Sequence, residues 1–552
     1  MPGRFLNTAR SRLAMSDPFD LAARLLIAAL FVLALLIYRD YAISNDEEVQ
    51  HRYGELILAY HLSGFTDLSV FRYQNLYLYG GLFDLICVIL GRVPTLDVYV
   101  IRHILCALTG VGGILAAWAT ARLIAGPRAG FIAAVALTVC GPWFGTMFNH
   151  TKDIPFAAAM MGATYFLLRA VRDLPKPRLM HLLAFGVLLG GALGQRATGQ
   201  RATGLLMLLY TLIAIAMHAP RPPSWRGAAH FTASSLLLFV PAFALAYLIM
   251  IVGWPWAALS LFNPVRAIFA FAHFQYPVKT LLSGEVYLMA DVPRWYVPLY
   301  LAIKMPLAIL TGSALALVSI VALWRMASAQ ARDTAFIAFI VAFPLACQVI
   351  GHGPGFSGMR HFSFVVPPLA VLTGIGFEWM LAWLESKRRA LAIATFTAIG
   401  AWLLWPASIM LRLHPYESLF FNPLVGGLEG AQQRYDTDYW VNVMGELVTE
   451  LEAMLDREKL DREGKPSRRY YVAVCGERVP FDRLAAPRGR LQYAVGSDPA
   501  DFFIAPTHMH CENAIDGRVV HTVERMGVPI GVIKDRRTLV AEPQQDRTLA
   551  KK

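Results

Sequence analysis

Charged residues are scarce in this chain. Only 16% of its 552 residues are Asp, Glu, Lys or Arg, and 56% are hydrophobic. Soluble domains carry about 25% charged residues. Together with a mean hydropathy of +0.48, this scarcity excludes an ordinary soluble domain. The composition predicts a polytopic membrane protein.

The chain also lacks two other kinds of pattern. It has no basic stripe with interleaved aromatic residues, which argues against nucleic acid as a partner. Its six cysteines form no CxxC or Cys/His spacing of the zinc-binding kind. Cys475 and Cys511 lie in a polar C-terminal stretch, and they could form a disulfide if that stretch is extracytoplasmic.

Long apolar runs are plentiful, and the first covers residues 21–41. It is long enough to span a bilayer, and basic residues precede it, so residues 1–20 are expected to stay in the cytoplasm. The run has no small-residue cleavage site and is therefore interpreted as an anchor. The acidic stretch NDEE at 45–48 emerges beyond it, on the outer membrane surface.

The remaining apolar runs predict about eleven spans in all, with the N-terminus inside and the C-terminus outside. Residues 49–92 are too polar or too interrupted to cross, and they are expected to form interfacial helices in the first outer loop. With that assignment most basic short loops fall on the cytoplasmic side. Residues 21–412 therefore form the predicted membrane domain, whose later spans are expected at 98–121, 129–147, 154–170, 180–218 (a pair), 230–252, 296–324, 334–350, 362–384 and 390–411.

Residues 413–552 differ in composition. Residues 443–460 have the periodicity of an amphipathic helix, and 469–475, 501–505 and 517–524 are typical of strands. The fold class predicted for the whole chain is thus mainly α and polytopic, with a small extracytoplasmic α/β domain at the C-terminus.

The predicted topology gathers acids and cations at the outer boundary. Cations bind and stabilise a phosphate, and a carboxylate can take a proton from an attacking hydroxyl. This set predicts transfer of a group from a polyprenyl phosphate carrier, with membrane lipids as neighbours. Its members are Asp46, Glu47, Glu48, Lys152, Asp153, Arg196, Arg201 and Arg360, together with His150, His352 and His361 on the same side. Arg196 and Arg201 belong to the tandem repeat QRATGQRATG at 195–204.

Several short motifs resemble the GT-C glycosyltransferases, in particular the bacterial protein O-mannosyltransferases and the lipid A aminoarabinose transferases. An Asp-Glu pair opens the first outer loop, an acidic residue follows a later outward span in NHTKDIPFA, and an arginine opens a late span in GMRHFSFVVPP. The segments PRWYVPLYLAIKMP and FFNPLVGGLEGA also resemble a bacterial subgroup. The resemblance covers most of residues 20–440.

The resemblance implies roles for individual residues. Asp46 would be the general base that deprotonates the acceptor hydroxyl, with inversion at the sugar, and Glu47 would orient the base or the acceptor. Asp153 would position the acceptor or the sugar, or pair with Lys152. Arg360 would hold the leaving phosphate, with His361 standing where tyrosine is common.

The duplicated repeat leaves open whether Arg196 or Arg201 faces the site. Lys304 lies about two turns inside the expected span 296–324, and it could reach an outer phosphate by snorkelling. A monophosphate leaving group carries less charge than a nucleotide diphosphate, so these cations are expected to suffice. No metal or other cofactor is expected, as the resemblance also implies.

The resulting hypothesis is that the protein is a glycosyltransferase of the plasma membrane, of the kind found in bacterial inner membranes, and that its site faces outward. Its donor would be a polyprenyl-phosphate-linked sugar and its acceptor a lipid, glycan or protein hydroxyl. A flippase or transporter of lipid-linked substrates is one alternative, although transporters normally keep carboxylates near the bilayer midplane. A non-catalytic GT-C-like scaffold is the other.

Overall fold

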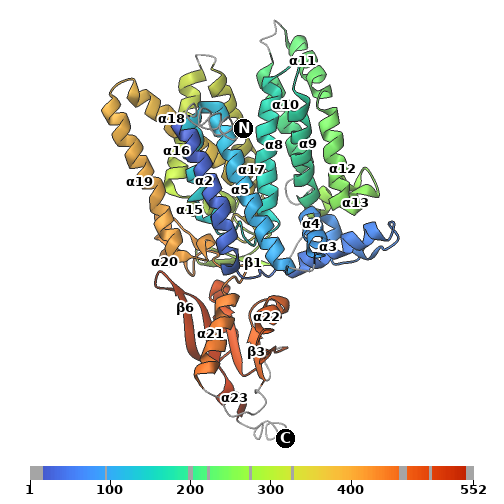
Figure 1. Ribbon diagram of the computed structural model, residues 1–552, viewed down its shortest axis with the longest axis vertical. Coiled ribbons are helices and arrows are strands. Elements are labelled where there is room, and N and C mark those ends of the chain that lie inside the picture. The colour runs from blue at the N-terminus through green and yellow to red at the C-terminus, as the bar shows by residue number, and fades with distance from the viewer. Residues whose placement is uncertain are drawn as a thin grey trace, which may run out of the picture.

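A bundle of long helices forms the larger part of the molecule, and a smaller region containing a sheet lies beyond one end of it (Figure 1). The computed structural model describes residues 17–541 apart from 94–95, 197–202, 220–223, 273–276, 325–327, 459–468 and 496–499. Within these residues, seven helical segments are long and apolar enough to cross a membrane, which confirms the expected mainly α membrane fold. Their helices are α2 (Pro18–Ile37), α5 (Val98–Ala125), α8 (Asp153–Arg172), α16 (Leu307–Trp324), α17 (Ala329–Ile350), α18 (Val366–Glu385) and α19 (Arg389–Leu413).

Five shorter apolar helices belong to the bundle as well. The pair α11 (Trp225–Leu237) and α12 (Val240–Gly253) is bent by 46° at its break and is long and apolar enough to cross a membrane only when both helices are taken together. Pro241 stands at the start of α12, where its missing N–H accounts for the break. The others are α6 (Pro127–Thr138), α9 (Leu179–Arg196) and α10 (Thr203–His218), which occupy the positions of the remaining expected spans. The count of about eleven crossings stays a prediction because these three helices are shorter.

Two expected spans are broken in the structure, and a proline explains each break. The run 296–324 divides into α15 (Tyr296–Lys304) and α16, with Pro306 between them. The run 129–147 divides into α6 and the one-turn α7 (Gly141–Phe144), which carries Pro142 near its start. Lys304 therefore ends a short helix and does not lie two turns inside a long span.

Small residues let some bundle helices approach closely. A Cβ on Gly376 of α18 would lie 2.0 Å from the carbonyl oxygen of Gly312 on α16. Such backbone contact is typical of helix pairs in membranes, where burial of apolar surface does not drive association.

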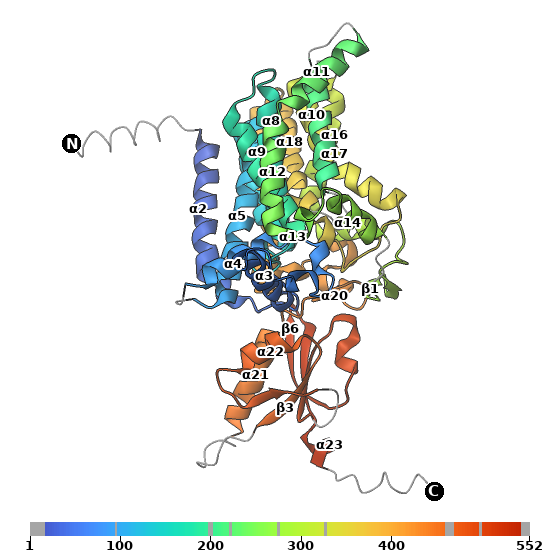
Figure 2. The same cartoon turned by 90° about the vertical axis from the view of Figure 1, so that its right-hand side faces the viewer.

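At one end of the bundle, α3 (Glu47–Leu62) and α4 (Leu82–Gly91) lie beside the boundary with the C-terminal region (Figures 1 and 2). The ten residues of α4 rise about 15 Å, half of the about 30 Å of a hydrocarbon core, so α4 alone does not span. The other short elements near this end are η1 (Tyr38–Asp40), η2 (Ser69–Phe71), η3 (Leu76–Leu78), α13 (Pro255–Ala258), α14 (Asn263–Ala272), the hairpin β1 (Lys279–Leu282) and β2 (Glu285–Leu288), η5 (Arg360–Val365), η6 (Glu417–Leu419), η7 (Pro423–Val425) and α20 (Gly427–Ala431).

The C-terminal region, residues 444–541, contains a five-stranded mixed sheet in the order β4-β3-β5-β7-β6. The pairs β3–β4 and β3–β5 are parallel, whereas β5–β7 and β6–β7 are antiparallel. Sequence analysis placed the first helix and three of these strands and missed β4 and β7. The elements are α21 (Met444–Arg457), β3 (Tyr470–Val474), α22 (Arg478–Ala485), β4 (Leu491–Tyr493), β5 (Phe502–Pro506), η8 (His508–Asn513), β6 (Arg518–Arg525), β7 (Val528–Asp535) and α23 (Arg537–Ala541).

Candidate active site

Three side chains from distant parts of the chain meet at the end of the bundle near the C-terminal region. Arg360 donates from Nη2 to Oδ2 of Asp46 at 2.8 Å and from Nε to Oδ2 of Asp153 at 3.0 Å. Asp46 precedes α3, Asp153 is the first residue of α8, and Arg360 is the first residue of η5. One guanidinium thus holds two carboxylates, and the arrangement carries one surplus negative charge.

The two carboxylates differ in how they are placed. Both stand at helix N-termini, where the helix dipole stabilises negative charge. Asp46 makes no capping hydrogen bond to α3 with its side chain, so this carboxylate is available to Arg360. Its side chain is 41% exposed, against 2% for Asp153 and 7% for Arg360. Asp46 is therefore the member of the triad that solvent or a substrate can reach.

Glu47 faces the other way, into the bundle. Its side chain is fully buried, and Oε1 accepts a hydrogen bond from the backbone N–H of Ser44 at 2.8 Å and lies 3.2 Å from Nε2 of His103. Oε2 lies 3.6 Å from Nε of Arg102. In this arrangement Glu47 fixes the loop that carries Asp46.

Arg102 is the centre of a buried polar cluster that sequence analysis missed. Its Nη2 donates to Asp84 at 2.9 Å, to Gln50 at 3.0 Å and to Thr151 at 2.8 Å. These partners come from α4, from α3 and from the loop before Asp153. An arginine followed by a histidine inside the apolar run 98–121 was the available signal. The cluster ties together the elements that supply Asp46 and Asp153.

The other residues proposed for the site lie around the triad. Nζ of Lys152 lies 5.3 Å from the ring centre of Tyr79, and the ring of His361 stacks on Phe356 at 4.8 Å. The ring centre of Phe356 in turn lies 5.5 Å from Cζ of Arg360. Arg196 ends α9, but its side chain and the whole of Arg201 lie outside the described residues. The roles of these residues stay predictions.

Lys304 occupies an apolar and aromatic environment. Nζ donates to the carbonyl oxygen of Ser418 at 2.8 Å and lies 3.7 Å from the ring centre of Phe421. Burial lowers the pKa of Lys304 to about 7, although the negative charge of Asp436 raises it by a smaller amount. This amine therefore changes charge in the neutral range, which is common for groups at functional sites.

The segment 436–443 covers the triad from the side of the C-terminal region, and sequence analysis gave it no role. The indole ring of Trp440 lies 3.9 Å from Cζ of Arg360, and its carbonyl oxygen accepts from the backbone N–H of Asn45 at 3.3 Å. Asn45 also accepts from the backbone N–H of Glu477 at 3.2 Å. Residues 45–46 are thus held between the segment and the C-terminal region.

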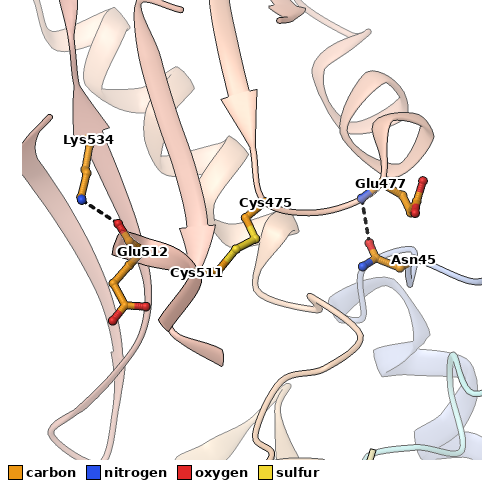
Figure 3. The surroundings of a disulfide bond; sticks show 6 residues. All are labelled: Asn45, Cys475, Glu477, Cys511, Glu512 and Lys534. Atoms are coloured by element: carbon orange, nitrogen blue, oxygen red, sulfur yellow. Dashed lines mark hydrogen bonds between the residues drawn. A yellow bond between two sulfur atoms is a disulfide. The ribbon is translucent and has the colours of Figure 1, made fainter. Parts of the chain in front are cut away.

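A disulfide lies just behind this contact. Cys475 and Cys511 are bonded, with Glu477 and its hydrogen bond to Asn45 close by (Figure 3). The backbone N–H of Thr437 in the segment donates to Nδ1 of His508 at 3.3 Å, three residues before the second cysteine. The disulfide therefore joins the two loops of the C-terminal region that contact the site.

Comparison with known proteins supports the resemblance suggested by the motifs. Residues 98–247 match the family model described as dolichyl-phosphate-mannose-protein mannosyltransferase. The chain resembles the GT-C glycosyltransferases. No curated protein gives a significant match.

Solved structures similar to the chain share little sequence identity with it. ArnT from Cupriavidus metallidurans in the apo state is 16% identical, with 95% of this chain and 100% of that chain covered and a TM-score of 0.47. The apo oligosaccharyltransferase of Archaeoglobus fulgidus is 13% identical, with 86% and 65% covered and a TM-score of 0.45. The S. cerevisiae protein O-mannosyltransferase Pmt1-Pmt2 complex bound to the sugar donor is 14% identical, with 48% and 38% covered and a TM-score of 0.30.

Proposed function

We propose that this protein is an integral membrane glycosyltransferase that moves a sugar from a polyprenyl-phosphate donor to an acceptor hydroxyl with inversion. The observation that carries the proposal is the exposed carboxylate of Asp46, held at 2.8 Å by a buried arginine that also binds Asp153. A base and a phosphate-binding cation in direct contact are what this reaction requires. The match to a mannosyltransferase family model that covers 98–247 adds independent support.

The ion pair between Arg360 and Asp46 implies the order in which donor and acceptor react. The donor phosphate is the stronger ligand for Arg360 because it offers several anionic oxygens, and it displaces the carboxylate of Asp46 while Asp153 keeps its bond. The freed Asp46 then takes the proton of the acceptor hydroxyl. The hydroxyl oxygen forms the new bond to the anomeric carbon, the bond from that carbon to the phosphate oxygen breaks, and the polyprenyl phosphate leaves on Arg360.

The remaining residues support this exchange. Glu47, buried against Arg102 and His103, sets the position of the Asp46 loop and does not touch the acceptor. When protonated, Lys304 adds positive charge for the leaving phosphate. Lys152, His361 and one of the repeat arginines complete the polar surroundings of the donor.

The proposed location is a plasma membrane of the bacterial inner-membrane type, with the site facing the exterior or periplasm. The basic loops after α5 and α8 lie at the far end of the bundle from the site (Figure 2), as expected for a cytoplasmic face. In this proposal the cytoplasmic tail comprises residues 1–20, the catalytic domain residues 21–412 and the outer domain residues 413–552. Single cysteines at Ser63 and Ser386, in a Cys347→Ser background, should label from outside and from inside respectively.

The decisive experiment is a transfer assay with purified protein and radiolabelled polyprenyl-phosphate sugars. Asp46→Asn should reduce transfer at least about a hundredfold, because general base catalysis contributes that much. Asp67→Asn, an outer carboxylate away from the triad, is the matched control and should act as wild type. Full transfer by Asp46→Asn would refute the mechanism, and lipid translocation without any transfer would favour a flippase.

The outer domain has a proposed role in acceptor recognition. Because it contacts Asn45 directly, its removal should reduce acceptor use more than donor binding. Deletion of residues 443–552 followed by separate measurement of the two tests this. Equal loss of both would show that the domain serves the site as a whole.

A further inference from the structure

Trp440 contacts Arg360 and the residue that precedes Asp46. Its carbonyl oxygen accepts from the backbone N–H of Asn45, the residue before the base, and its ring covers the guanidinium at 3.9 Å. A cation this close to an indole face is attracted by the ring quadrupole, and the attraction grows when water is excluded. One residue therefore fixes the place of the base loop and of the arginine.

The segment that carries Trp440 is anchored on both sides. The carboxylate of Asp438 accepts from the backbone N–H groups of Asn442 at 3.0 Å and Val443 at 2.9 Å, which closes the turn. Nδ2 of Asn149 donates to Oδ1 of Asn442 at 2.7 Å, four residues from Asp153 in the chain. The position of Trp440 is thus determined by the same loop that leads into the triad.

The indole N–H of Trp440 meets no acceptor in ordinary hydrogen-bond geometry within the part of the chain that the structure describes, although the residue is only 4% exposed and the hydroxyl of Tyr439 lies beside it. Buried tryptophan N–H groups normally find an acceptor. The neighbouring ring of His150 lies 5.1 Å away, and burial lowers the pKa of His150 to about 3. The residue whose ring covers Arg360 therefore also carries a donor that makes no ordinary hydrogen bond, beside a neutral histidine.

We propose that Trp440 belongs to the donor-phosphate site: its ring holds the guanidinium of Arg360, and its indole N–H donates to a phosphate oxygen that replaces Asp46. The inference rests on the proposed function, because it assumes that a lipid phosphate binds Arg360. It assigns a binding role to a residue outside the membrane spans. It also explains why the segment 436–443 is built over the triad.

The test is a native mass spectrometry titration of the full-length protein with undecaprenyl phosphate and, in parallel, with undecaprenol. Trp440→Phe keeps a ring but loses the N–H, and Trp440→Leu loses both. We expect phosphate-lipid affinity to fall about fivefold in Trp440→Phe, as for one hydrogen bond, and about thirtyfold in Trp440→Leu. Undecaprenol binding should not change.

The control is Trp143→Phe, since Trp143 in α7 is also buried with an unpaired indole N–H. It should bind as wild type, and thermal midpoints of all variants show whether folding is kept. Wild-type affinity in either Trp440 variant, or equal losses for both lipids, would overturn the inference. Arg360→Ala separates the two proposals: if it too binds as wild type, the proposed function itself fails.

Discussion

The two ends of the helix bundle use arginine in different ways. At the far end, arginines tie helices together through carboxylates on other helices. Arg122 donates twice to Asp20 at 2.6 Å, and Arg128 joins Glu378 and Glu385 on α18. Arg172 binds the fully buried Asp333 through Nε at 2.9 Å. These contacts link helices that are distant in the chain.

At the site end, Arg360 is shared by two carboxylates, one of them 41% exposed. Helix α8 joins the two ends of the bundle, because it begins with Asp153 and ends with Arg172, about 30 Å away by helical rise. A closed, buried pair resists exchange, since breaking it leaves a charge without water. A shared arginine with one exposed acid can exchange that acid for a ligand at small cost. Exposure of one carboxylate does not by itself mark a functional arginine, because Glu385 on Arg128 is 46% exposed as well. Arg360 differs from Arg128 in its place, at the end of the bundle where Asp46, Asp153 and the segment 436–443 meet.

The largest expected effect sharpens this comparison. Arg360→Ala should reduce transfer more than about a hundredfold, because it removes the charge that stabilises the leaving phosphate. It should also lower the thermal midpoint, because the buried Asp153 loses Arg360 as a partner. Arg172→Ala should lower the thermal midpoint without reducing the specific activity of the folded fraction. Asp333 keeps Arg332 and His218 as partners, so the expected loss of stability is about 1–3 kcal/mol. Specific activity of the folded fraction and thermal midpoints in one detergent provide the two readouts. If Arg172→Ala lost activity without losing stability, the distinction between the ends would collapse.

Sequence analysis could assemble the triad because topology alone decides which face a loop occupies. Alternating spans and basic loops place Asp46, Asp153 and Arg360 together without knowledge of packing. The same approach could not tell that Glu47 points inward, because neighbours in the chain turn to different faces of a helix. Trp440 carried no signal either, since its importance arises from a contact between residues 80 positions apart.

A middle-sized effect is expected from the disulfide. The double variant Cys475→Ser/Cys511→Ser should reduce turnover about fivefold. Without the disulfide, the loops that carry Glu477 and His508 are no longer joined. Each loop contacts the site through one backbone N–H hydrogen bond of ordinary strength. Transfer rates of the double variant and of reduced wild type check this. Replacement of the buried Cys140, which is a free thiol, by alanine is the control. Unchanged turnover would mean that the C-terminal region keeps these contacts without the bond.

The smallest expected effect is a pH dependence from Lys304. Burial lowers its pKa to about 7, below the value of about 10.4 for an exposed lysine. The amine is therefore charged below pH 7 and becomes neutral as the pH rises through 7, so its attraction for the donor phosphate is lost in that direction. We expect the KM for the donor to rise about threefold between pH 6 and pH 8.

Lys304→Met should flatten that profile. The matched variant is Lys279→Met at the exposed start of β1, which should keep the wild-type profile. Donor KM measured at five pH values for the three proteins decides the point. A wild-type slope in Lys304→Met would assign the titration to another group. Lys304 would then have a structural role like that of the far-end arginines: it would hold α15 to the carbonyl of Ser418 and take no part in donor binding.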